Sequence, residues 1–194
     1  MSHNIAWIDL ETTGTSHTAG SILEVGCLVT DRDGTVLGSF TRLVRPHPTH
    51  VARMDPVVVE LHRTSGLLAE MEACDQRRRS ADPGDAPTTT TDRELRAFLD
   101  PFAYRGQVIL GGSGVGHFDQ RWIRHHLPRT AKALTWWVYD VGVVRRFLST
   151  VNPALVRPAP EKAHRGLADA TDHAAEWFFY RDLLADCDPS GDDR

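Results

Sequence analysis

Acidic side chains occur in this chain at positions where a globular core rarely tolerates them. Asp9 and Glu11 follow a short apolar run, and in a strand they share one face about 7 Å apart. Asp119 falls within the apolar arc of a helix predicted to begin near Phe118. A carboxylate that faces a core usually has a cation or several donors beside it. The alternatives are a strand that runs out into a polar turn, and an Asp119 that interacts only with its own helix dipole.

A histidine and an acid near the C-terminal end form a second candidate group. Asp169 lies in the first turn of a helix predicted over 167–185. On one continuous helix, five residues would rotate His164 about 140° away from Asp169. If the two act together, His164 must therefore belong to the preceding loop. A polar stripe farther along this helix is interpreted as a solvated face; it comprises Asp172, His173 and Glu176.

The composition fits one α/β domain that could position these groups. A chain of 194 residues supports a single core, and its 41% hydrophobic and 25% charged residues are ordinary for a globular protein. No apolar run approaches the roughly 18 to 20 residues of a membrane span, and the N-terminus lacks a secretory pattern. The spacing of Cys27, Cys74 and Cys187 indicates neither a disulfide framework nor a zinc site. We expect a cytoplasmic protein with no membrane partner, one domain over 1–186 and a mobile acidic tail over 187–194.

Strands come first and then alternate with helices, which indicates a mixed sheet covered by helices. The predicted strands are 5–10, 22–30, 35–45, 107–110 and 136–139. The predicted helices are 56–61 with a continuation over 67–71, 92–102, 118–127, 141–151 and 167–185. Thr91 and Glu94 are expected to form a capping box for the helix over 92–102. Residues 73–91, which are rich in Pro, Gly and Thr, are expected to form a flexible insert.

The formal charge of −4 excludes a protein that holds nucleic acid by bulk positive charge. It does not exclude an enzyme that contacts phosphates through bound metal ions, because such ions require carboxylate ligands. Two divalent ions would bring the formal charge to about zero. We therefore expect the metal-free protein to bind an anionic substrate poorly.

Three stretches occur in an order that is typical of one enzyme class. They are WIDLETTG over 7–14, GHFD over 116–119 and HRGLAD over 164–169. In this order they resemble the DEDDh class of 3′-to-5′ exonucleases, and within it the oligoribonucleases, over nearly the whole chain. The resemblance implies an α/β, ribonuclease H-like exonuclease fold with a central mixed five-stranded sheet flanked by helices.

The resemblance also implies the roles of the site residues. His164 would be the general base, and two divalent ions, Mg²⁺ or Mn²⁺, would be held by Asp9, Glu11, Asp119 and Asp169. Two such ions can stabilise both the attacking and the leaving oxygen of a phosphodiester. The residues expected to contact the substrate are Leu10, Thr12, Thr13, His117 and Trp136. Oligoribonucleases are generally homodimers whose partner subunit reaches into the site from the segment before Asp140. Trp136 and Trp137 stand in that segment, and either could stack on a base, unless at least one of them packs in the core.

The chain departs from the oligoribonuclease pattern at several positions. Thr12 and Thr15 stand where these enzymes carry Met and Leu, Val57 replaces a Trp, and the pairs 114–115 and 117–118 also differ. Several of these residues are closer to proofreading exonucleases. The leading hypothesis is hydrolysis of short single-stranded RNA to nucleoside 5′-monophosphates, and the alternative is a DNA exonuclease of proofreading or repair type. A non-catalytic nucleic-acid-binding relative is disfavoured, because all four acids and the histidine are present.

Overall fold

The computed structural model describes residues 3–77, 85–158 and 162–185. The acidic tail over 187–194 and the centre of the predicted insert lie outside the described residues. None of the described helices is long and apolar enough to cross a membrane. Cys27 and Cys74 are buried free thiols, and Cys187 lies outside the described residues.

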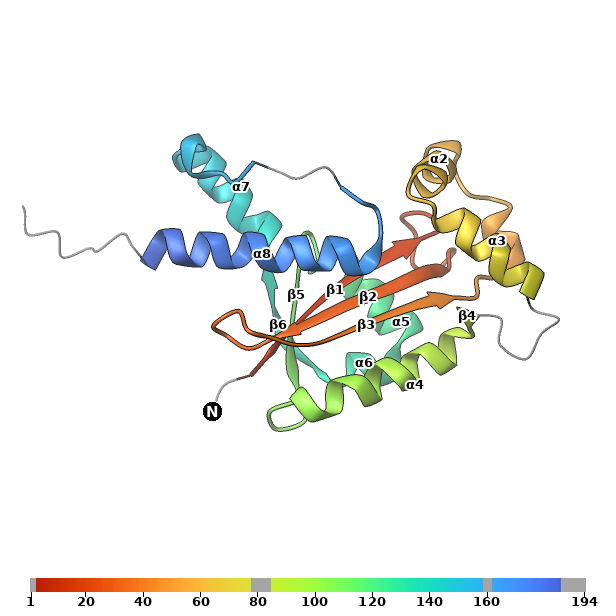
Figure 1. The fold of residues 1–194 in the computed structure, drawn as a ribbon, viewed down its shortest axis with the longest axis horizontal. Coiled ribbons are helices and arrows are strands. Elements are labelled where there is room, and N and C mark those ends of the chain that lie inside the picture. The colour runs from red at the N-terminus through yellow and green to blue at the C-terminus, as the bar shows by residue number, and fades with distance from the viewer. Residues whose placement is uncertain (1–2, 78–84, 159–161, 186–194) are drawn as a thin grey trace, which may run out of the picture.

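One mixed sheet of six strands organises the chain, in the order β4-β3-β2-β1-β5-β6 (Figure 1). The strands are β1 (Ile5–Thr12), β2 (Ile22–Thr30), β3 (Val36–Val44), β4 (Asp85–Ala86), β5 (Val108–Gly112) and β6 (Leu134–Asp140). β1, β2 and β3 pair antiparallel, whereas β5 pairs parallel to both β1 and β6. Asp31 helps to close the turn between β2 and β3, because its Oδ1 accepts hydrogen bonds from the backbone N–H groups of Asp33 and Thr35.

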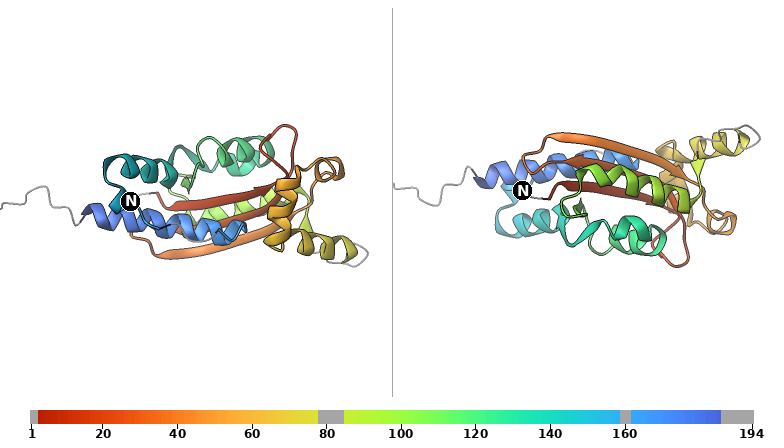
Figure 2. Two further views of the ribbon diagram at one scale, coloured as in Figure 1. Left: turned by 90° about the horizontal axis from the view of Figure 1, so that it is seen from above. Right: turned by 90° about the horizontal axis from the view of Figure 1, so that it is seen from below.

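Helices cover both faces of this sheet. They are α1 (Pro48–Val51), α2 (Pro56–Thr64), α3 (Leu67–Arg77), α4 (Thr88–Leu99), α5 (Asp119–His126), α6 (Pro128–Ala131), α7 (Val141–Val151) and α8 (Gly166–Ala185). Short 3₁₀ turns span Asp100–Phe102 and Pro153–Leu155. α8 lies above the sheet in Figure 1 and α4 lies below it, and Figure 2 shows each helix from its own side.

The alternation of β1 determines which helix its acids face. Ala6 and Ile8 belong to the core beneath α4 and α5, whereas Trp7 packs with Ala170 and Ala174 of α8. Because side chains alternate along a strand, the odd-numbered residues after Trp7 also point toward α8. The two acids of β1 are therefore directed toward the start of α8.

The structure confirms the mixed sheet and corrects several details. A sixth, two-residue strand, β4, joins β3 at Leu43 and Val44. α3 extends to Arg77 and α4 begins at Thr88, so the described ends of the predicted insert belong to helices and to β4. The capping box is wrong: Pro87 occupies the N-cap position, and the Thr91 hydroxyl donates to the Pro87 carbonyl instead.

The predicted solvated face of α8 is also wrong in part. His173 and Glu176 are only 5% and 7% exposed. The reason is that α7 packs against α8 and brings Arg145, whose guanidinium donates to both Glu176 carboxylate oxygens. Tyr180 donates to Glu176 as well, at 2.9 Å. Asp172 remains half-buried.

Candidate active site

Four carboxylates and one histidine converge where β1 ends and where α5 and α8 begin. Asp9 and Glu11 extend from β1, Asp119 is the first residue of α5, and Asp169 lies in the first turn of α8. All four line one cavity of about 380 Å³, together with His164. The structure thus brings together the five residues that the sequence singled out.

Asp119 links α5 to the strand that carries the first two acids. Its Oδ1 accepts a hydrogen bond from the backbone N–H of Leu10 at 3.2 Å, and the residue is 5% exposed. The N-terminal end of α5 favours a negative charge there. Burial and the nearby charge of Asp9 nevertheless raise the pKa of Asp119 above its ordinary value.

A pair of glycines lets Asp169 approach the strand acids. Gly166, the first residue of α8, lies against Gly26 of β2, which is the register partner of Asp9. A Cβ on Gly26 would lie 1.9 Å from the Gly166 carbonyl carbon, and a Cβ on Gly166 would lie 2.6 Å from the Gly26 nitrogen. Only glycine at both positions permits this contact. The contact carries Asp169, within the first turn of α8, to the side of Glu11.

His164 belongs to the loop before α8, as the helical geometry required. It adopts a left-handed backbone conformation with φ of 50°. One potential ligand atom from each of Glu11, His164 and Asp169 lies within 4.8 Å of the others. A histidine at the rim of an acidic cluster can accept a proton from a water molecule that approaches it.

Burial and mutual repulsion disfavour charge on these acids. Burial first, and then the charges of Asp169 and Glu24, raise the pKa of Glu11 to about 7. Burial followed by Glu11 and Asp169 raises the pKa of Asp9, and burial raises that of Asp169. Asp169 Oδ1 is also buried without a hydrogen-bond partner. Mg²⁺ and Mn²⁺ prefer carboxylate oxygens as ligands, and a bound ion would both satisfy the unpaired Asp169 oxygen and offset the repulsion among the acids. The residues present therefore fit divalent ions.

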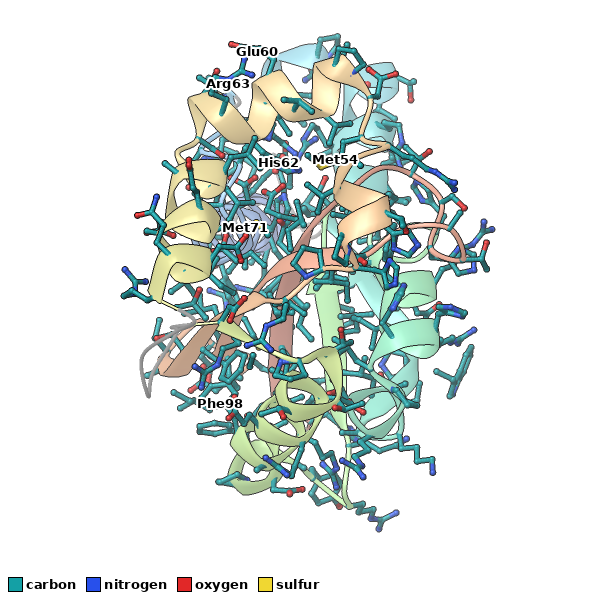
Figure 3. The ribbon with its side chains drawn as sticks, turned by 90° about the vertical axis from the view of Figure 1, so that its right-hand side faces the viewer. Met54, Glu60, His62, Arg63, Met71 and Phe98 are labelled. Atoms are coloured by element: carbon teal, nitrogen blue, oxygen red, sulfur yellow. The ribbon has the colours of Figure 1, made fainter. Side chains whose placement is uncertain are left out.

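Two histidines outside the predicted set of site residues also face the site. His62 of α2 is 1% exposed; its Nε2–H donates to the Thr12 carbonyl, and its Nδ1 lies 3.7 Å from Glu11 Oε2. Figure 3 shows His62 pointing inward from α2. His173 Nδ1 lies 3.9 Å from Asp9 Oδ1, and burial lowers the pKa of this imidazole to about 4.

Sequence signals for these additional residues differ in strength. His62 follows Val58 by one helical turn, which places it on the inward side of α2. His173 carries no such signal, because its helical position groups it with acids. Lys162, one of only two lysines in the chain, also lines the cavity.

The structure places three of the five predicted substrate contacts at the cavity. Leu10, Thr12 and His117 line it. Thr13 does not, because its hydroxyl accepts a hydrogen bond from the Ser21 N–H and holds the loop after β1. Trp136 is 81% exposed on the edge strand β6 and lines a separate cavity of about 240 Å³. Within one chain Trp136 does not reach the carboxylates.

Solved structures share this architecture. Exonuclease I with bound product aligns with a TM-score of 0.64 at 13% identity, over 95% of this chain and 48% of that one. A zinc-bound complex of E. coli exonuclease I with single-stranded DNA aligns with a TM-score of 0.65 at 13% identity, over 95% of this chain and 42% of that one. The chain spans less than half the length of these proteins. The fold is that of the ribonuclease H-like exonucleases.

Sequence relatives define the family. No family model matches the chain. The oligoribonuclease of Corynebacterium diphtheriae is 32% identical over 97% of this chain and 87% of its own length. The oligoribonuclease of Streptomyces coelicolor is 30% identical over 95% of this chain and 88% of its own length. The mitochondrial oligoribonuclease of Mus musculus is 28% identical over 95% of this chain and 74% of its own length. The chain belongs to the oligoribonuclease family, as its three motifs indicate.

Proposed function

We propose that this chain is a metal-dependent 3′-to-5′ exoribonuclease that releases nucleoside 5′-monophosphates from short single-stranded RNA. The observation that carries the proposal is the convergence of Asp9, Glu11, Asp119 and Asp169 with His164 around one cavity. Membership of the oligoribonuclease family supports short RNA as the substrate.

In this proposal each side chain has a distinct task. The four carboxylates would hold two divalent ions, Mg²⁺ or Mn²⁺, which supply charge that stabilises the attacking and leaving oxygens of the phosphodiester. His164 takes a proton from the attacking water as its oxygen bonds to phosphorus. The P–O3′ bond then breaks, and the departing O3′ takes a proton from solvent, so the shortened chain ends in a new 3′-hydroxyl. The terminal nucleotide leaves as a 5′-monophosphate. Lys162 attracts the phosphate from the rim of the cavity.

Leu10, Thr12 and His117 would contact the terminal nucleotides, because they line the cavity beside the acids. We also propose a homodimer, in which Trp136 stacks on a base in the partner's site. The position of β6 at the edge of the sheet, as far as the described residues show it, and the 81% exposure of Trp136 support this arrangement. Stacking on an indole tolerates any base, as a general exonuclease requires.

A second candidate function is 3′-to-5′ trimming of DNA. Thr12, Thr15, His117 and Phe118 line the cavity, and these are the residues at which the chain is closer to proofreading exonucleases. The E. coli exonuclease I chain that shares the fold was solved with single-stranded DNA.

Length and sugar profiling distinguishes the two functions. The same concentration of enzyme is assayed with Mn²⁺ on 5′-labelled RNA and on 5′-labelled DNA, with substrates from the dinucleotide to about 20 nucleotides. A strong preference for short RNA supports the proposal, whereas faster trimming of long DNA supports the second candidate. Asp119→Asn should lower kcat by about 100-fold or more on any substrate. Asp182→Asn, at an exposed position on α8, serves as the matched control, and an undiminished Asp119→Asn enzyme would overturn the site.

A further inference from the structure

Glu24 is a buried acid that lies outside the predicted carboxylate set. It sits on β2 directly opposite Glu11 of β1 and is 3% exposed. Its carboxylate accepts hydrogen bonds from Arg165 Nε at 3.1 Å, from Arg165 Nη2 at 2.8 Å and from the Gly166 N–H at 2.8 Å. Glu24 therefore holds the two residues that directly follow His164.

A second acid reaches the same guanidinium from a different element. Glu70 of α3 lies 2.6 Å from Arg165 Nη2. Arg165 thus connects β2, α3 and the loop that carries His164. α3 follows α2, whose His62 contacts the Thr12 carbonyl, so the arm formed by α2 and α3 contacts the site at two points.

The backbone of His164 needs such an anchor. Its φ of 50° lies in the left-handed region, which L-residues other than glycine adopt infrequently. Gly26 shares a face of β2 with Glu24. Because Gly26 has no side chain, residues 165–166 can lie directly on the strand there. Two features of one strand face, an acid and a glycine, fix the chain immediately after the histidine.

We propose that Arg165, held by Glu24 and Glu70, is a positioning residue that keeps the His164 imidazole at the rim of the carboxylate cluster during hydrolysis. This inference rests on the proposed function, in which His164 is the base. A bidentate pair between a guanidinium and a carboxylate fixes orientation as well as distance. A base displaced by about 1 Å can cost about 100-fold in rate.

A double-mutant cycle on purified full-length enzyme tests this role. Arg165→Ala should lower kcat by about 100-fold, while the KM for a short RNA and the Mn²⁺ concentration for half-maximal rate change by less than about 3-fold. In a His164→Ala background, Arg165→Ala should lower kcat by less than about 3-fold further, because its effect acts through that imidazole. Arg165→Lys, which keeps a cation near Glu24, should recover part of the loss.

The control is Arg96→Ala on α4, because Arg96 also pairs with an acid and is 30% exposed, against 29% for Arg165. Its kcat should match the parent enzyme. Far-UV circular dichroism and thermal melting confirm that each variant is folded. If Arg165→Ala does not fold, Glu70→Gln replaces it in the same cycle, because this substitution removes only the exposed partner of Arg165. Glu70→Gln should lower kcat by several-fold when His164 is present and should have no further effect in the His164→Ala enzyme.

The outcomes separate the two claims. A His164→Ala enzyme with unchanged kcat would overturn both the general-base assignment and this inference. If His164→Ala strongly lowers kcat, and Arg165→Ala then lowers kcat by about a further 100-fold in that enzyme, only the positioning role is overturned. That result would mean that Arg165 acts on the carboxylates or on the fold, independently of the histidine.

Discussion

Glu11 makes the stability of the metal-free protein depend on pH in a defined direction. Its ordinary pKa of 4.5 rises to about 7 in the fold, first through burial and then through the charges of Asp169 and Glu24. A carboxyl whose folded pKa is higher than its unfolded pKa binds its proton more tightly in the native state. The contribution of Glu11 to the free energy of unfolding is therefore greatest below about pH 4.5, falls as the pH rises toward 7, and levels off above it.

The size of this fall follows from the difference between the two pKa values. About 2.5 pH units correspond to about 3 kcal/mol for Glu11 alone, with a slope of up to about 1.4 kcal/mol per pH unit. Asp9, Asp119 and Asp169 shift in the same direction and steepen the dependence. Divalent ions should flatten it, because they favour the ionised acids.

Urea denaturation measured between pH 5 and about pH 8, in a chelator and in millimolar Mn²⁺, tests the linkage. Glu11→Gln should be more stable than the parent at the highest pH without metal, and its stability should fall less with pH. Glu60→Gln is the control, since Glu60 is 63% exposed on the outer side of α2 beside Arg63 (Figure 3). If Glu11→Gln and the parent protein showed the same pH slope in the chelator, the assignment of Glu11 as a buried and repelled acid would be refuted.

Three further substitutions test separate parts of the structure. Gly26→Ala should lower the free energy of unfolding by about 3 kcal/mol in urea titrations and abolish hydrolysis, because the added Cβ would lie 1.9 Å from the Gly166 carbonyl carbon. A stable and active variant would contradict the glycine contact. His62→Ala should cost about 1 to 3 kcal/mol by the same measurement, because it leaves the Thr12 carbonyl without its donor; an unchanged stability would argue against that hydrogen bond. Trp136→Ala should leave the free energy of unfolding within about 0.5 kcal/mol but raise the KM for short RNA by about 5-fold or more, because the base loses its stacking partner. An unchanged KM would count against the proposed stacking.

The residues that could be predicted are those whose local pattern determines their environment. Strand alternation places Asp9 and Glu11 on one face, and helical rotation separates His164 from α8. Both arguments need only one element. The convergence of the three motifs became predictable only through their resemblance to a known family, because spacing along the chain does not show which elements meet.

What could not be predicted depends on contacts between elements. The polar stripe of α8 is buried because Arg145 of α7 satisfies Glu176, and nothing in the α8 sequence reveals that partner. Likewise, Glu24 stands in an otherwise apolar strand, and the buried-acid argument used for Asp119 applies to it equally. The donor that satisfies it, Arg165, is 141 residues away in sequence, so the pairing could only be seen in the fold.

The electrostatics of the site explain why a protein of formal charge −4 can act on an anionic polymer. α5 and α8 both begin at the cavity, and their N-terminal ends carry partial positive charge. Lys162 offsets part of the rise in the pKa of all four acids as well. These positive charges are too small to keep the acids ionised, because burial and repulsion still raise the pKa of each of the four acids above its ordinary value. Further positive charge is required before the acids ionise together, so we expect divalent ions to bind before a phosphodiester can approach the cluster.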